Sequence, residues 1–356
     1  MKYLTTPIKL SVSLAAFLLS QASFAGGTDA GTIVENTATI SYSVGGAAQA
    51  PITSDVADFK VDQKVDLTVT GDSGTNIIVS PSTARATTGN KLTYVLKNEG
   101  NSPQDFSVLV KHLATDNFDA GTGTTTSPQA FEACQFTVTP DGPGTAIAAT
   151  AISATPPVVS LIKDESATIE VTCSMPNRPD VDDGHLSTLE VLAAAVDAAG
   201  VIMAESTIAD REDDIDVVLA DGIGASDANR DAIHSDTQTY EIDVPMLTVV
   251  KKSAVISDPF NGTAQPKRIP GAVVEYTITV ENTSDSVASG LTVTDVLTAA
   301  IAGEVAYVTG SVISTSGATP TFDAASNTVE ATGISVPAGT TATPSVAVVT
   351  FRVTIL

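Results

Sequence analysis

Apolar and polar residues alternate with a period of two along many short stretches of this chain. The clearest lies in residues 32–44, where one side of an extended strand carries Ala38, Ile40, Tyr42 and Val44. The other side carries Thr37, Thr39, Ser41 and Ser43. Successive side chains of a strand point to opposite faces of a sheet, so this pattern predicts a β-strand with one apolar face.

A second strand pattern closes the printed sequence. Four residues of this stretch share one face: Val349, Phe351, Val353 and Ile355. We expect this strand to form an open sheet edge, the acceptor edge, because no closing strand pattern follows it. The apolar face of residues 37–44 would then be a donor strand that fills the edge of another copy. The alternative is that the N-terminal strand completes its own first domain.

Two regions of the chain repeat one pattern. Residues 91–98 (KLTYVLKN) alternate, break at a polar loop and resume at Phe106, and residues 273–282 (VVEYTITVEN) do the same before Leu291. The openings Val65-Asp66-Leu67-Thr68-Val69 and Pro245-Met246-Leu247-Thr248-Val249 also match. Two copies of one β-sandwich module explain the repetition, although Tyr276 lies two residues further from its asparagine than Tyr94 does.

These residues resemble a bacterial conserved-repeat surface domain, the "domain of unknown function 11" class. The likeness rests on Ile269-Pro270-Gly271, Tyr276–Val280, Asn282-Thr283, Leu291–Asp295 and Val305–Ile313, and it is best over residues 244–356. The resemblance implies an immunoglobulin-like β-sandwich in an exported, surface-associated protein and no catalytic residues. The family's closing strand resembles G-T-x-x-x-N-T-A-T, which stands here at residues 31–39, near the opposite end of the chain.

The predicted organisation is all-β, with tandem immunoglobulin-like β-sandwiches. We expect a signal peptide in residues 1–25, a strand segment in 26–64, an enlarged sandwich with an acidic insertion in 65–244 and the repeat-type sandwich in 245–356. The stretch LEVLAAAVDAA (residues 189–199) has the alanine content of a helix, but its all-β context and the turn at 197–200 favour a hairpin.

Composition limits the function. The formal net charge is −24, with no tryptophan and few aromatic residues, so the core must be built from small and β-branched side chains. A chain this acidic repels phosphate backbones, which argues against nucleic-acid binding. Lys2 and Lys9 precede a short apolar run at residues 10–19, and Ser23-Phe24-Ala25 supplies a small-x-small cleavage signal, as in a secretory signal peptide; no stretch is long enough for a membrane span. We therefore expect an extracellular or cell-surface location.

Cys134 and Cys173 are the only cysteines. In an exported protein two cysteines of one domain most simply form a disulfide, and closing this loop stabilises the fold by roughly 3–4 kcal/mol in the chain-entropy model. A free catalytic thiol is the alternative.

Few motifs suggest chemistry. Gly71-Asp72-Ser73-Gly74 resembles a serine-protease nucleophile loop, but it sits between two strand patterns as a turn would, and His112, His185 and His234 are scattered. Asp227, Asn229 and Asp231 have the spacing of a calcium loop, yet Ala232 and Gln238 depart from the EF-hand pattern. A solvated acidic loop or a weakly bound calcium ion fits these residues, and no other cofactor is expected.

The sequence thus favours a non-enzymatic surface or extracellular structural protein that self-associates head-to-tail by strand donation. The competing interpretation is a monomeric adhesin or binding module whose receptor or matrix ligand the sequence does not specify.

Overall fold

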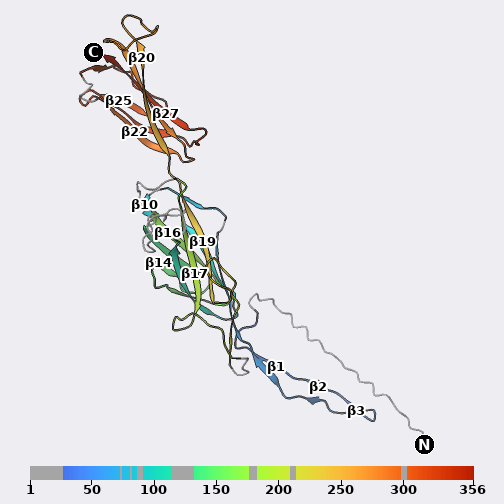
Figure 1. Cartoon of the computed structure of the whole chain (residues 1–356). Coiled ribbons are helices and arrows are strands. Elements are labelled where there is room, and N and C mark those ends of the chain that lie inside the picture. Colours follow the sequence, from blue (N-terminus) through green and yellow to red (C-terminus); the bar gives the residue numbers. More distant parts are fainter. Residues whose placement is uncertain are drawn as a thin grey trace.

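The computed structural model describes residues 27–72, 74–80, 82–85, 91–113, 132–175, 183–208, 214–297 and 303–356. These residues form strands and turns and contain no helix, which confirms the all-β prediction. Accordingly, none of them builds a helix long and apolar enough to cross a membrane. The molecule is elongated, with an N-terminal hairpin at one end and two β-sandwiches following it in chain order (Figure 1).

The N-terminal hairpin (residues 33–60) is one two-stranded antiparallel ribbon. Its paired strands are β1 (Ile33–Asn36) with β6 (Ala57–Lys60), β2 (Thr39–Ile40) with β5 (Ile52–Thr53), and β3 (Ser43–Val44) with β4 (Ala47–Ala48). Gly45 and Gly46 form the tip, both with positive φ, as a two-residue hairpin turn requires. The prediction of a solitary donor strand is therefore wrong, because residues 33–44 already pair with the returning arm.

The first sandwich (residues 63–242) consists of two packed sheets. One has the order β14-β13-β16-β11-β8, with β10 beside β16, and the other has the order β15-β12-β17-β19-β9. A short parallel pair joins β7 (Gln63–Val65) to β18 (Val217–Leu219). The sheet strands are β8 (Leu67–Gly71), β9 (Ile77–Val79), β10 (Ser82–Arg85), β11 (Leu92–Asn98), β12 (Gln104–His112), β13 (Glu132–Pro140), β14 (Ile147–Ala151), β15 (Val158–Leu161), β16 (Ser166–Met175), β17 (Leu186–Val196) and β19 (Ile233–Ile242).

Alternation along these strands builds the first core. β11 and β12 bury every second residue, including Tyr94 and Phe106, and these side chains meet between the sheets. The hydroxyl of Tyr94 donates to the Leu189 carbonyl at 2.8 Å, and that of Tyr240 to the Val171 carbonyl at 3.1 Å, so both buried phenols are satisfied. The predicted disulfide between Cys134 and Cys173 is present.

The alanine-rich stretch is a strand. β17 runs through residues 186–196, a turn follows, and Val196 bridges antiparallel to Ile202, as the hairpin prediction required. Its small side chains suit a central strand: Ala193 and Ala195 are fully buried beneath the opposite sheet. Packing in the sandwich thus outweighs the helix propensity of alanine.

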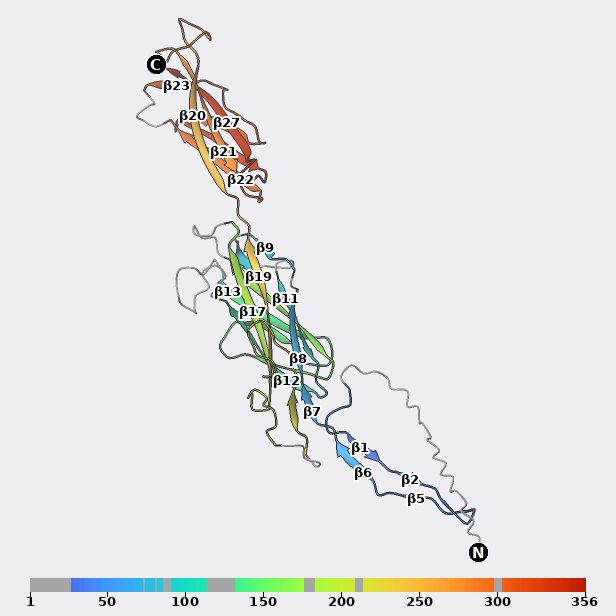
Figure 2. The same ribbon diagram turned by 45° about the vertical axis from the view of Figure 1, so that its right-hand side comes forward.

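The second sandwich (residues 247–355) is smaller. One sheet has the order β20-β21-β27-β23, with β24 also beside β27, and the facing sheet has the order β22-β26-β25. The strands are β20 (Leu247–Ser257), β21 (Val273–Asn282), β22 (Ala288–Val296), β23 (Val305–Tyr307), β24 (Ile313–Ser314), β25 (Thr319–Asp323), β26 (Thr328–Val336) and β27 (Ser345–Ile355). Figure 2 shows it joined end to end with the first sandwich.

β27 is not an open edge, so the predicted acceptor edge is wrong. It pairs with β21 along its whole length on one side and with β23 and β24 on the other. Val349, Phe351 and Val353 point into the core and are buried, and Ile355 packs against the same core. Their alternation reflects a central strand of the sandwich.

Two buried asparagines show which positions of the sandwiches correspond. Nδ2 of Asn98 donates to the carbonyls of Ser102, Leu161 and Ile162, and Nδ2 of Asn282 donates to those of Ser286 and Pro337. Asn98 lies opposite Leu67, and Asn282 lies opposite Leu247.

This correspondence makes Val69 equivalent to Val249, β12 to β22 and β16 to β27. The tyrosines that marked the repeat are offset, because Tyr94 pairs with Gly71 whereas Tyr276 pairs with Ser253.

Replacing Asn98 by alanine removes the side chain that ties the β11–β12 loop to the facing sheet. Because the carbonyl partners would be left buried without a donor, we expect Asn98→Ala to lower the free energy of unfolding of the first sandwich by about 2–4 kcal/mol. Urea denaturation measures this loss. The exposed Asn76→Ala is the matched control and should cost less than about 1 kcal/mol; equal effects would contradict the assignment.

Candidate functional site

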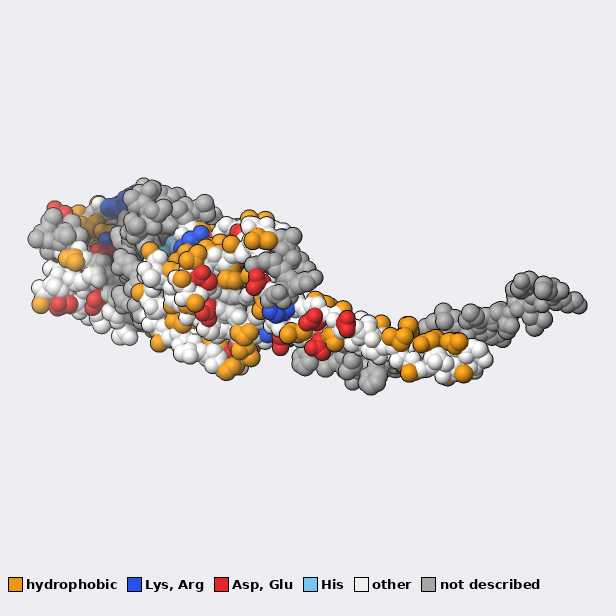
Figure 3. Space-filling model, turned by 90° about the horizontal axis from the view of Figure 1, so that it is seen from below, with side chains coloured by type: hydrophobic (Ala, Val, Ile, Leu, Met, Phe, Trp, Pro, Cys, Tyr) orange, Lys and Arg blue, Asp and Glu red, His pale blue; other side chains and the backbone are white. Residues whose placement is uncertain are grey.

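The N-terminal hairpin exposes almost all of its apolar side chains. Residues 35–59 are exposed without exception. Ile40 and Ile52 form a cross-strand pair in register, with exposed fractions of 60% and 53%. Figure 3 shows apolar side chains along the projecting ribbon. An isolated two-stranded ribbon is marginally stable in water, so this surface is suited to burial against something else.

The root of the hairpin is fixed to the first sandwich. The Gly31 amide donates to the Val61 carbonyl at 2.8 Å, and the Ala30 amide donates to the Asn101 carbonyl at 3.1 Å. Lys163 pairs with Asp29 at 2.5 Å. The ribbon beyond this root projects away from both sandwiches (Figures 1 and 2). It is therefore presented in a defined direction while its length stays uncovered.

The second sandwich has an unpaired edge. In the first sandwich β12 pairs with β15 on one side and with β17 on the other, and β19 then continues that sheet. The equivalent strand β22 pairs with β26, and among the described residues no strand takes the place of β17 or β19. Its free backbone groups lie along the side where β20 is also a sheet edge.

Side chains along this side are left uncovered. Val249 lies opposite Val280, a core residue, and therefore on the inward face of its sheet, yet it is 64% exposed. The equivalent Val69 is 1% exposed. The difference arises because β19 lies alongside β8: the Val69 amide donates to Nδ1 of His234, and the Gly71 amide donates to the Asp236 carboxylate.

A single ion pair spans the uncovered side. Nζ of Lys251 lies 2.5 Å from Oδ2 of Asp295 on β22, and it also lies 4.6 Å from the centre of the Tyr276 ring. The lysine is 43% exposed and the Asp295 side chain is 10% exposed, so water reaches one partner of the pair but not the other. We call the strip formed by β20, β22 and these side chains the open groove.

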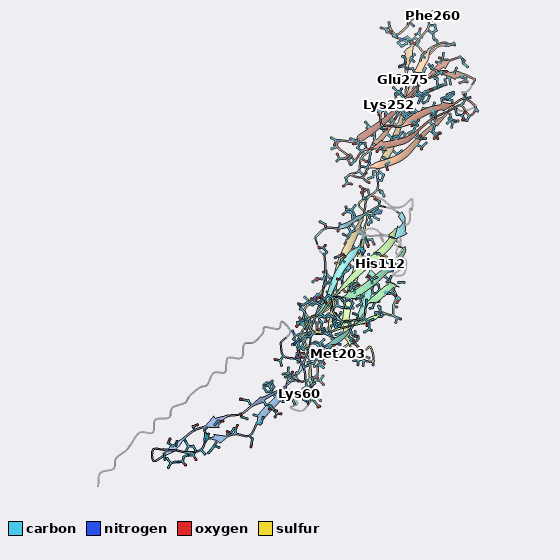
Figure 4. The ribbon with its side chains drawn as sticks, turned by 180° about the vertical axis from the view of Figure 1, so that it is seen from behind. Lys60, His112, Met203, Lys252, Phe260 and Glu275 are labelled. Carbon is cyan, nitrogen blue, oxygen red and sulfur yellow. A yellow bond between two sulfur atoms is a disulfide. The ribbon has the colours of Figure 1, made fainter. Side chains whose placement is uncertain are left out.

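The predicted donor and acceptor residues are far apart in one chain. Ala38, Ile40, Tyr42 and Val44 lie on the hairpin, whereas the β27 residues are inside the second sandwich. Figure 4 places Lys60, at the hairpin base, and Phe260, on the second sandwich, toward opposite ends of the molecule.

The open groove and the returning arm of the hairpin were not identified from the sequence. The Gly-Gly pair at residues 45–46 was the available signal for the returning arm, which lacks clear alternation.

The predicted calcium-loop residues have partners within their own loop. The Asp227 carboxylate accepts from the Gly224 amide at 2.7 Å and from the Ser235 hydroxyl at 2.6 Å. The Asp231 carboxylate accepts from the amides of Ala228 and Ile233. These bonds shape the loop without an ion, and calcium binding by Asp227, Asn229 and Asp231 stays a prediction.

A different carboxylate cluster lies between the sandwiches. Asp183, Asp243 and Asp285 each place one carboxylate oxygen within 4.8 Å of the others, in the part of the chain that the structure describes. Burial raises the pKa of Asp183, and the negative charges of Asp285, Asp243 and Glu241 raise it further, against a hydrogen bond from the Val244 amide. The cluster is thus a site of charge repulsion at the junction.

Two of the three histidines have contacts that the structure describes. Nδ1 of His234 accepts the Val69 amide, and Nε2 of His112 lies 3.4 Å from Sγ of Cys134. Ser73 lies outside the described residues, so the structure does not locate its side chain. The shallow hollow between Gln104, Leu161 and Met203 also has no histidine or cysteine in its lining.

Fold and site together describe an all-β chain of two β-sandwiches with a projecting hairpin. No family model matches the sequence, and no curated protein does. Among solved structures, the C-terminal domain of the antigen I/II-family protein AspA of Streptococcus pyogenes is similar at 10% identity and a TM-score of 0.34, over 82% of this chain and 91% of that one. AvmM, described as catalysing macrocyclization in alchivemycin A biosynthesis, aligns at 10% identity and a TM-score of 0.25, over 58% and 97%. Likenesses this distant support no functional inference.

Replacing Asp285 by asparagine tests the junction cluster. Because one neighbouring negative charge is removed, we expect Asp285→Asn to lower the pKa of Asp183, as measured by carboxyl NMR titration. The raised pKa in the folded state means that this group favours folding below its unfolded pKa, and the contribution is lost as pH rises through the folded value. Stability near neutral pH should therefore rise in the variant. Asp55→Asn, on the hairpin, is the control, and an unchanged Asp183 titration in Asp285→Asn would contradict the assignment.

Proposed function

We propose that this protein is an exported, non-enzymatic structural component of a cell surface or extracellular assembly, which self-associates through its N-terminal hairpin. The observation that carries the proposal is the hairpin itself. Seven large apolar residues stand exposed on it: Ile33, Ile40, Tyr42, Val44, Ile52, Val56 and Phe59. Burying each large apolar side chain contributes roughly 1.5–3 kcal/mol, so covering these residues would contribute several kcal/mol before the costs of ordering and association are subtracted.

Export is supported by two independent features. The N-terminal pattern is that of a signal peptide, and the Cys134–Cys173 disulfide persists in oxidising compartments. The high negative charge fits a soluble surface that avoids nonspecific contacts.

Self-association is favoured over an unrelated receptor by the lack of charge along the outer part of the hairpin, residues 36–54. Residues 36–54 carry no charged side chain, in a chain that contains 41 acidic residues. Two strongly acidic copies repel each other over most of their surfaces, so a neutral apolar segment is where they can approach.

Deleting residues 33–60 tests the proposal. We expect the full chain, exported and purified, to form oligomers or filaments that light scattering and electron microscopy detect, and the deletion variant to stay monomeric. Ile40→Asp should raise the dissociation constant at least about tenfold, because a charge replaces a buried apolar group.

Thr39→Asp is the matched control, since it changes the adjacent residue on the opposite face and should assemble normally. A full chain that remains monomeric at high concentration, and that binds host or matrix material as a monomer, would instead support a binding module.

A further inference from the structure

We infer that the N-terminal hairpin of one copy inserts into the open groove of the next copy's second sandwich, where its two arms take the places that β17 and β19 have in the first sandwich and that no described strand fills in the second. The inference rests on the proposed function and names its partner: a second copy of this chain. It also replaces the predicted single donor strand with a ribbon, and the predicted acceptor at β27 with β22 and β20.

The first sandwich provides the template. Its strands β8, β11, β12 and β16 have equivalents in β20, β21, β22 and β27, as the paired asparagines show. Beyond β12 the sheet of the first sandwich continues with β17, β19 and the three-residue strand β9; β17 and β19 are antiparallel neighbours in register from Leu186 to Ala194. In the second sandwich no described pair of antiparallel strands continues the sheet beyond β22. The hairpin is a pair of antiparallel strands that joins no larger sheet.

The dimensions agree. β17 and β19 contain 11 and 10 residues. The hairpin arms run through residues 33–44 and 47–60, long enough to replace both. In β17 the residues that fill the core are Leu189, Val191, Ala193 and Ala195, which alternate with residues facing the other way. Ala38, Ile40, Tyr42 and Val44 offer the same spacing on the first arm.

The open groove exposes the backbone edge of β22 and the side chain of Val249, and the two arms of the hairpin could cover them. The first arm would pair antiparallel with the free edge of β22, as β17 pairs with β12. The second arm would lie beside β20 and cover Val249, as β19 covers Val69. The Lys251–Asp295 pair must shift to admit the second arm; Lys251 is 43% exposed, whereas Asp295 is 10% exposed and must keep a polar partner when the lysine moves.

Strand direction makes the assembly linear. β8 and β19 run parallel, because Val69 bonds His234 and Gly71 bonds Asp236. A second arm parallel to β20 therefore ends near Ser257, beside the loop that presents Phe260, which is 85% exposed.

The donor's first sandwich follows directly after the second arm, so it would lie beyond this end of the acceptor. Because the hairpin and the groove are different surfaces, each copy both donates and accepts, and the contact repeats without closing.

A charged substitution in the groove tests the inference. We expect Val249→Asp to abolish at least nine-tenths of the assembly of the full chain at a concentration where the parent assembles, measured by light scattering. Val250→Asp is the matched control: it is the next residue on the same strand but faces away from the core, and it should assemble like the parent. Circular dichroism checks that both variants fold.

Hydrogen exchange gives a readout that does not depend on the variants. A peptide of residues 31–61 added to the hairpin-deleted chain should slow amide exchange in β20 and β22 and leave β23 and β25 unchanged. If the full chain assembles through its hairpin while Val249→Asp behaves like the parent and protection appears elsewhere, the groove assignment is overturned and the proposed function stands. If the full chain never assembles, or closes on its own hairpin as a monomer, both are overturned.

Discussion

The constraint that dominates this molecule is that a β-sheet must pair its backbone groups and cover its apolar face. Among the described residues the first sandwich meets it most fully: β12 pairs on both sides, and the buried phenols and Asn98 have hydrogen-bond partners. The N-terminal hairpin and the second sandwich each meet it in part. One has paired strands with no core, and the other has a core with an unpaired edge.

The hairpin has paired strands but an uncovered apolar face, whereas the second sandwich has a core but an unpaired strand edge. Each therefore offers what the other is missing. A small sandwich whose side is open would normally protect its edges with charges, prolines or bulges. Here the open groove carries Lys251 and Asp295, which neutralise each other across the opening, and it leaves Val249 uncovered. Residues 36–54 of the hairpin carry no charged side chain.

Alternation along the sequence was sufficient to predict the all-β class and the strand character of residues 37–44 and 347–356, and the disulfide followed from two cysteines in a chain expected to be exported. It could not distinguish an edge strand from a central one, because both bury every second residue; this is why Val349 and Phe351 were assigned to the wrong environment. The returning arm was missed because its apolar residues are interrupted by Ala, Gln and Pro51. Val249 carried no signal at all, since its exposure depends on strands absent from its own sandwich.

The hairpin, the first sandwich and the second sandwich follow one another along a single long axis (Figure 2). For an assembly joined as inferred, a pulling force along that axis would act parallel to the strands at the joint. The backbone hydrogen bonds between β22 and the inserted ribbon would then be loaded together in shear instead of breaking one after another. Such a fibre would resist stretching far better than sideways peeling, a mechanical bias suited to a tether exposed to flow.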